Sequence, residues 1–111
     1  MKKALLLLLM VSTTVLATPQ FDESPEKPFS TASNKYKTVT LTWLTSKNPQ
    51  ATCNAEAKKR GYNNFGFSVM GCAFWDANQC TIVTKESPNM HTLGHEVRHC
   101  FQGDWHSNNG Q

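Results

Sequence analysis

Two histidines separated by three residues, His95 and His99, are the side chains of this 111-residue chain best placed to do chemistry. They lie in the stretch HEVRH, within a segment expected to be helical, so the two imidazoles lie one turn apart on the same side. Neutral imidazole nitrogens bind zinc at about 2.0 to 2.1 Å, and a helix fixes the separation of the two rings. The spacing therefore predicts that both histidines bind one Zn²⁺ ion.

A catalytic zinc usually keeps three protein ligands and leaves the fourth position to water. Gly103 allows the chain to reverse after the helix, so His106 is the best third ligand and Asp104 the second. Glu96 is rotated by about 100° from His95 around the helix, so we expect it not to bind the metal. It would instead accept a proton from metal-bound water as a general base.

Three other residues of the same helix have more ordinary expected roles. His91, one turn before His95, is expected to face solvent or to support the ligands from outside. Arg98 lies on the polar side, where it could steady a substrate carboxylate or carbonyl, although such an arginine is more often simply solvated. Cys100 is turned towards the core, which favours half of a disulfide over a thiolate ligand.

The run HEVRHCFQGDWH, from His95 to His106, resembles the zincin metallopeptidases. Its helix, glycine turn and third histidine are similar to the metzincin pattern, with the glycine displaced by one residue and no methionine after Met90 to form a methionine turn. The resemblance implies a zinc peptidase in which His95, His99 and His106 hold the metal and Glu96 is the general base. The chain is also similar to small exported bacterial proteins with a GCA…CTI hairpin before such a helix.

The first 17 residues have the layout of a secretory signal peptide, with two lysines, an apolar run and cleavage expected after Ala17. The apolar run ends at Ser12, well short of the roughly 20 residues of a membrane anchor. Removing residues 1–17 takes away Lys2 and Lys3 and lowers the formal charge from +3 to +1. We therefore expect a secreted or periplasmic monomer without a membrane anchor, and no nucleic-acid partner.

The rest of the chain is expected to form an arm and one domain. Residues 18–34 contain three prolines and no hydrophobic period, which indicates an extended or mobile arm. Residues 35–111 are expected to form a minimal zincin-like α+β domain, with a small antiparallel sheet, a backing helix and the helix that carries the histidines. Two disulfides would stabilise this small domain.

The elements of that domain have recognisable sequence signals. Alternation predicts a half-buried strand over 36–45, with Val39, Leu41 and Trp43 on one face. A helix over 49–60 is bracketed by Asn48 and Gly61, and a β-hairpin follows over 65–75 and 80–85. The last helix is expected to begin at Pro88 after the N-cap Ser87, and to stop at Gly103.

The four cysteines of the mature chain predict two disulfides in an oxidising compartment. Cys72 and Cys80 flank the tip of the predicted hairpin, so a bridge between them is favoured. Cys53 would then pair with Cys100. The two other pairings remain open, because sequence alone does not choose between them.

These features favour hydrolysis of peptide bonds by a zinc-activated water, with Glu96 as the general base. The substrate would be a peptide or protein, either an extended peptide segment or a peptidoglycan cross-bridge. The alternative function is a disulfide-stapled exported binding or inhibitor module, in which the histidines hold a structural metal or none.

Overall fold

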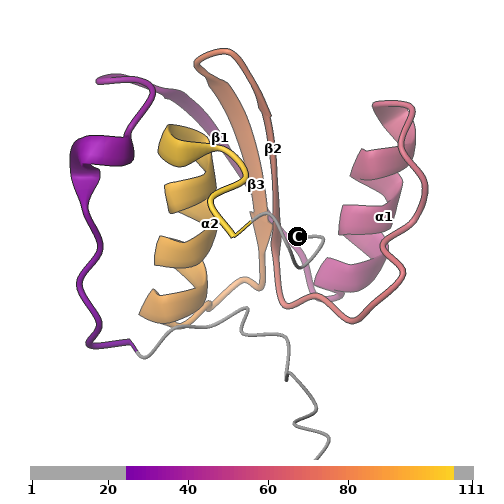
Figure 1. Cartoon of the computed structure of the whole chain (residues 1–111). Helices are drawn as coiled ribbons and strands as arrows, with labels where there is room; N and C mark the ends of the chain where they lie inside the picture. The colour runs from indigo at the N-terminus through magenta and orange to yellow at the C-terminus, as the bar shows by residue number, and fades with distance from the viewer. Residues whose placement is uncertain (1–24, 107–111) are drawn as a thin grey trace, which may run out of the picture.

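A computed structural model describes residues 25–106, which form an α+β domain of one three-stranded sheet and two helices (Figure 1). A short 3₁₀ helix, η1, spans Thr31–Ser33 and precedes this core. The strands are β1 (Thr40–Thr45), β2 (Cys72–Asp76) and β3 (Gln79–Thr84), and the helices are α1 (Pro49–Lys59) and α2 (Met90–Gln102). Within these described residues, no helix has the length and apolar character needed to cross a membrane.

The sheet is mixed, so the predicted antiparallel sheet is wrong for one of its two pairings. The strand order is β1-β3-β2, with β3 antiparallel to β2 and parallel to β1. β3 lies at the centre and is the most buried of the three strands, with Ile82 and Val83 fully buried. β1 lies at an edge, which leaves Leu41 and Trp43 on the predicted inward face 42% and 46% exposed.

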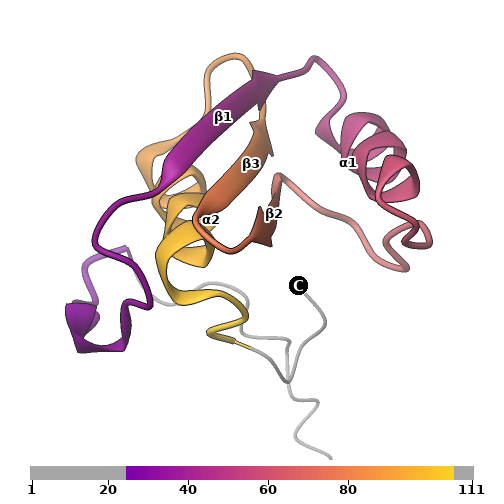
Figure 2. The same cartoon turned by 90° about the horizontal axis from the view of Figure 1, so that it is seen from above.

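The two helices cover opposite faces of the sheet, as both views show (Figures 1 and 2). On the α1 face, Cys53 of the helix packs in a buried cluster with Val69, Cys72 and Val83. On the α2 face, a second cluster joins Cys80, Ile82 and Cys100 and is covered by half-buried apolar side chains that include Leu93, Val97 and Phe101. The sheet therefore separates two small cores.

The predicted disulfide connectivity is wrong, because the bridges are Cys53–Cys72 and Cys80–Cys100. Cys72 lies opposite Val83 in the hairpin, and Cys80 lies opposite Trp75. Because side chains alternate along a strand, Cys72 and Cys80 point to opposite faces of the sheet and cannot meet. Each instead reaches the helix on its own face.

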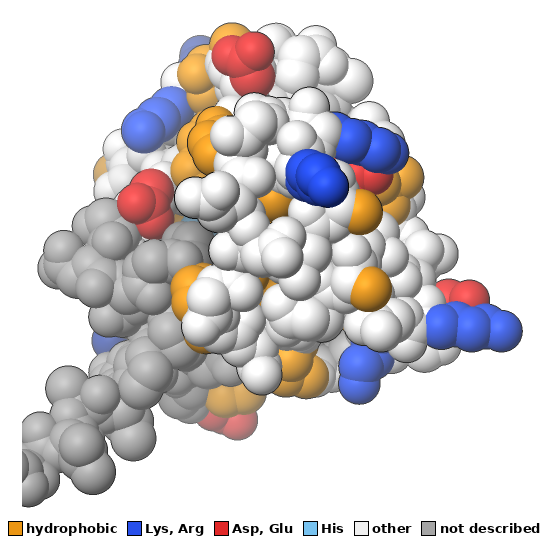
Figure 3. All heavy atoms as spheres, turned by 90° about the vertical axis from the view of Figure 1, so that its right-hand side faces the viewer, with side chains coloured by type: hydrophobic (Ala, Val, Ile, Leu, Met, Phe, Trp, Pro, Cys, Tyr) orange, Lys and Arg blue, Asp and Glu red, His pale blue; other side chains and the backbone are white. Residues whose placement is uncertain are grey.

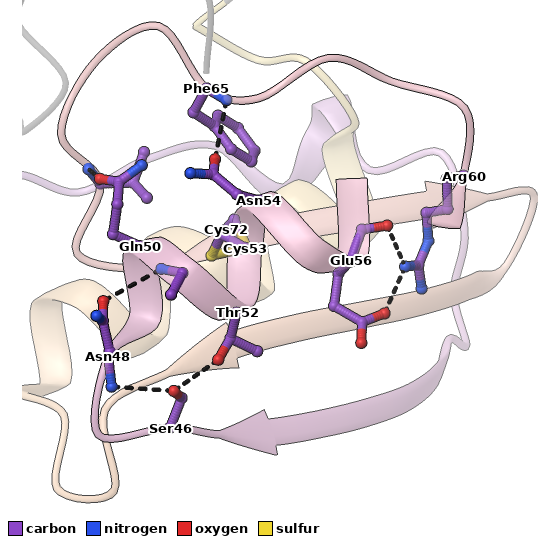
Figure 4. The surroundings of a disulfide bond; sticks show 12 residues. Ser46, Asn48, Gln50, Thr52, Cys53, Asn54, Glu56, Arg60, Phe65 and Cys72 are labelled. Atoms are coloured by element: carbon purple, nitrogen blue, oxygen red, sulfur yellow. Dashed lines mark hydrogen bonds and ion pairs between the residues drawn. A yellow bond between two sulfur atoms is a disulfide. The ribbon is translucent and has the colours of Figure 1, made fainter. Parts of the chain in front are cut away.

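α1 begins as predicted. The Asn48 side chain accepts a hydrogen bond from the Ala51 amide at 3.1 Å, and Pro49 occupies the first turn. Two further side chains of the helix hold the loop that leads to β2: Gln50 Oε1 accepts from the Val69 amide, and Asn54 Oδ1 from the Phe65 amide (Figure 4). On the face formed by α1, hydrophobic side chains are scattered among polar ones (Figure 3).

α2 begins two residues later than predicted and ends where expected. Asn89, rather than Ser87, is the N-cap, and its side chain accepts a hydrogen bond from the Thr92 amide at 2.7 Å. Gly103 follows the last residue of the helix with φ +67°, in the left-handed region that favours glycine. The chain therefore stops following the helix at Gly103, and the residues after it fold back over the last turn of α2.

The segment before β1 packs against the end of α2. The Lys35 amide donates to the Phe101 carbonyl at 2.7 Å, and the Gln102 side chain donates to the Ser30 carbonyl at 2.9 Å. The described end of the predicted arm is thus held by hydrogen bonds to the helix. The predicted signal peptide and residues 18–24 of the arm lie outside the described residues.

Candidate metal centre

Three imidazoles converge on one point at the C-terminal end of α2. His106 Nε2 lies 3.1 Å from His95 Nε2 and 2.8 Å from His99 Nε2. One ring nitrogen from each histidine falls within 4.8 Å of those of the other two. Two nitrogens bonded to one tetrahedral zinc ion at about 2.0 to 2.1 Å lie about 3.3 Å apart, so the three rings are spaced to share one ion.

The turn after α2 delivers the third ring. The Gly103 amide donates to the His99 carbonyl at 2.8 Å, which ends the helix, and the Trp105 amide donates back to the Gly103 carbonyl at 2.9 Å. His106 is thereby folded over the last turn of the helix. The close neighbour of a Cβ at residue 103 would be Lys35 Nζ at 2.9 Å, the end of a flexible side chain, so it is the backbone conformation of φ +67° that favours glycine here.

A backbone hydrogen bond sets the tautomer of His99. Its Nδ1 lies 2.8 Å from the Gly103 carbonyl, which can only accept, so Nδ1 carries the proton and Nε2 keeps its lone pair for a metal. Such a hydrogen bond on the far side of a ligating imidazole is the usual way in which its orientation is fixed.

Burial keeps the same imidazole neutral. His99 is 2% exposed and His95 is 9% exposed. Desolvation is the main reason why the pKa of His99 falls from its ordinary 6.5 to about 3; the Gly103 hydrogen bond opposes it, and His106, His95 and Arg98 add to it. Because the neutral form is the one that binds metals, His99 is ready to act as a ligand at neutral pH.

The two histidines of α2 are both buried. Two tryptophans cover them. The Trp75 ring of β2 stacks on His99 at 5.2 Å between ring centroids, and Trp105 lies 5.0 Å from His95. Aromatic walls exclude water from the ligand atoms and so strengthen their electrostatic interaction with a cation.

Glu96 is buried beside the cluster but is not one of the converging groups. Glu96 is 5% exposed. Together with His99, Gly71 and Trp75 it lines a cavity of about 50 Å³, and it is not part of the group of three histidines. A Cβ at Gly71 would lie 2.8 Å from the Val83 carbonyl oxygen and 3.3 Å from Glu96 Cγ. Gly71 therefore leaves room for the Val83 carbonyl and for the Glu96 side chain. The sequence around Gly71 gave no indication of this role.

The remaining predicted candidates stand apart from the three rings. Asp104, the second choice of third ligand, is exposed and does not join the converging group. His91 is half-buried and is likewise outside that group. Cys100 is half of a disulfide, as its inward position predicted, although its partner is Cys80 and not Cys53; no free cysteine occurs in the described part of the chain.

A groove of about 940 Å³ reaches the edge of this centre. Trp75 and Asp104 line it at the histidine end, and Tyr62, Phe67 and Phe74 line it between the hairpin and the loop after α1. Trp75 and two other residues line both the groove and the small cavity beside Glu96. The groove therefore adjoins the cavity that Glu96 and His99 line, although none of the three histidines and not Glu96 itself lines the groove.

No family model matches the chain, and no curated protein or solved structure matches it either. Three nitrogen donors, an adjacent buried carboxylate and a nearby groove are the parts from which metal-dependent hydrolytic sites are built.

Proposed function

We propose that the protein is a zinc-dependent peptidase in which His95, His99 and His106 bind the metal and Glu96 is the general base. The observation that carries the proposal is the convergence of three Nε2 atoms, with separations of 3.1 and 2.8 Å from His106 to the other two. Within the described residues this is the one group of side chains arranged to hold a metal ion.

Zinc is the metal that the donors favour. Imidazole suits zinc as well as copper, iron and nickel, but three histidines with a fourth position open to water are a common arrangement of catalytic zinc. The two disulfides are consistent with an oxidising compartment, which supports a secreted or periplasmic protein. Such a protein would meet peptides outside the cytoplasm.

When bound, zinc would polarise a substrate carbonyl and lower the pKa of a water to about 7. Glu96 would accept the proton of the attacking water, because its carboxylate lines the same cavity as His99, and that cavity of about 50 Å³ has room for a water. The protonated Glu96 would then donate to the leaving amine. The hydrogen bond from His99 Nδ1 to the Gly103 carbonyl would keep the His99 ring in the same orientation during the reaction.

The substrate class that the groove favours is an extended peptide. Tyr62 and Asp104 both line the groove. Its other walls combine aromatic side chains with amide and carboxylate groups. Aromatic side chains can pack against the apolar parts of a peptide, and the amides can pair with its backbone. A peptidoglycan cross-bridge is a peptide of the same kind and remains within this class.

The test is Glu96→Gln in the zinc-loaded mature protein, assayed against a mixture of peptides with cleavage detected by mass spectrometry. We expect a fall in kcat/KM of about 10²- to 10⁴-fold, the usual contribution of a general base, with zinc content unchanged. Glu86→Gln is the matched control, since Glu86 is exposed on the loop before α2. Zinc binding without any cleavage by the wild-type protein would instead favour the binding module with a structural metal.

A further inference from the structure

We propose that Arg98 is a positioning residue for the third histidine: it holds Trp105, and hence His106, in place, and residues 29–35 hold Arg98. The inference rests on the proposed metal site and goes beyond it, because it assigns the segment before β1 a part in metal binding. Arg98 lies between the two helical histidines in sequence and is half-buried.

The guanidinium of Arg98 is stacked between two aromatic rings from distant parts of the chain. Its Cζ lies 3.8 Å from the centroid of the Trp105 ring and 4.3 Å from that of Phe29. A planar guanidinium between two ring faces gains both cation–π attraction and stacking, which an ammonium group cannot reproduce. The sandwich therefore ties the turn after α2 to the segment before η1.

A line of hydrogen bonds fixes the arginine in that position. Arg98 Nε donates to Gln102 Oε1 at 2.9 Å, and Gln102 Nε2 donates to the Ser30 carbonyl at 2.9 Å and to Asn34 Oδ1 at 2.8 Å. The amide of Gln102 thus uses both its donor and its acceptor group. The buried Gln102 is a bridge from the segment before β1 to the arginine.

Trp105 passes this restraint to the metal ligands. Its ring centroid lies 4.4 Å from that of His106, 5.0 Å from that of His95 and 5.6 Å from that of His99. His95 and His99 are oriented by a helix that a disulfide ties to β3. His106 lies in a turn outside that helix, so its position depends on the packing of its neighbour.

The experiment compares metal affinity among variants of the mature, oxidised protein. Phe29→Ala removes one face of the sandwich at a half-exposed position, and Arg98→Ala removes its centre. We expect each to weaken Zn²⁺ and Co²⁺ binding by about 10- to 100-fold, the range seen when groups that support metal ligands are lost. The visible absorption band of the Co²⁺ protein should also shift, because the ligand geometry becomes less defined.

Two further variants separate positioning from general stability. Phe29→Tyr keeps the ring and should restore wild-type affinity. Arg60→Ala removes the matching arginine on the other face, whose Cζ lies 4.5 Å above the Phe74 ring, and should leave affinity and the Co²⁺ band unchanged. Thermal unfolding of the metal-free proteins shows how much stability each variant loses by itself.

The results decide between the inference and the proposal on which it rests. Loss of affinity in Phe29→Ala, with recovery in Phe29→Tyr, would support the positioning role. Equal affinity and an unchanged Co²⁺ band in Phe29→Ala and Arg98→Ala would overturn it, while the metal site of the wild-type protein would stand. A wild-type protein that binds neither metal would overturn both.

Discussion

On one face of the sheet, α1 is joined to β2 by Cys53–Cys72, and on the other, α2 is joined to β3 by Cys80–Cys100. The two covalent links enclose loops of nearly equal length, with sequence separations of 19 and 20. The helices nevertheless bury different side chains. The buried residues of α1 are a proline, a cysteine and an alanine, whereas those of α2 include two histidines, a glutamate and a glutamine.

The difference places the candidate metal centre on the α2 face. Burying an ionisable group costs free energy unless it is paired or binds a metal, so a small domain gains no stability by placing several together. Polar side chains of α1 hold the adjoining loops, as Asn54 does for Phe65, or pair with neighbours on the chain, as Glu56 does with Arg60 (Figure 4). The two buried histidines of α2 instead converge with His106 as a group that could hold a metal ion.

The largest expected effect comes from removing a metal ligand on the α2 face. His99→Ala should lower zinc affinity by more than about 100-fold, above the range produced by changing supporting groups, because one of three nitrogen donors is lost. Competition with a chromophoric chelator measures it. His91→Ala is the control on the same helix, and a comparable loss there would place the metal elsewhere.

The next largest effect is expected from removing a disulfide, because the two bridges should differ in their effect on zinc binding. Replacing both cysteines of either bridge by alanine should lower the free energy of unfolding by about 3 kcal/mol, because the two loops are almost equal in length. Urea unfolding measures this change. Only loss of Cys80–Cys100 should also weaken zinc binding, because that bridge fixes α2; an equal loss of affinity without Cys53–Cys72 would contradict the distinction.

The fold could be predicted from the sequence as far as local signals reach. Asn48, Pro49 and Gly61 mark α1 closely, and aromatic and β-branched residues mark the hairpin, although its first strand begins at Cys72 and not at residue 65 as predicted. Pairing between distant elements carries no such signal, so the parallel position of β1 and the disulfide connectivity were missed. Applying strand alternation to Cys72 and Cys80 would have excluded their bridge.

The candidate site was predicted better than its surroundings. The helical spacing of His95 and His99 is local, and Gly103 signals the turn that brings His106 to them. The residues that surround the site, by contrast, are brought to it by contacts between distant parts of the sequence. Nothing near Arg98 in the sequence indicates that Phe29 packs on it, and its charge alone favoured a solvated side chain.

A pH effect of intermediate size is expected in the metal-free protein. The pKa of His99 is about 3 when folded and about 6.5 when unfolded, so unfolding takes up a proton at intermediate pH. The contribution of His99 to the free energy of unfolding should be fully present above about pH 6.5. Below that pH the free energy of unfolding should fall by up to about 1.4 kcal/mol per pH unit. Urea unfolding at pH 7, 6 and 5 measures the slope. His99→Gln should flatten it, and an unchanged slope in that variant would refute the assignment.

The smallest effect is expected where the two faces behave alike. Asn48→Ala and Asn89→Ala each remove an N-cap hydrogen bond, from α1 and α2 respectively. Each should lower the free energy of unfolding by about 1 kcal/mol. Thermal unfolding checks both values. Zinc affinity should not change in Asn48→Ala, and a clear drop there would show that the two faces are coupled through the sheet.

X-ray absorption at the zinc edge of the purified, zinc-loaded protein tests the shared metal site most directly. The account predicts one zinc per chain, with three imidazole nitrogens at about 2.0 to 2.1 Å and no sulfur neighbour. Substituting His106 by alanine should reduce the imidazole count by one. A spectrum with sulfur at about 2.3 Å, or with fewer than three imidazoles in the wild-type protein, would contradict the claim that these three histidines bind one ion.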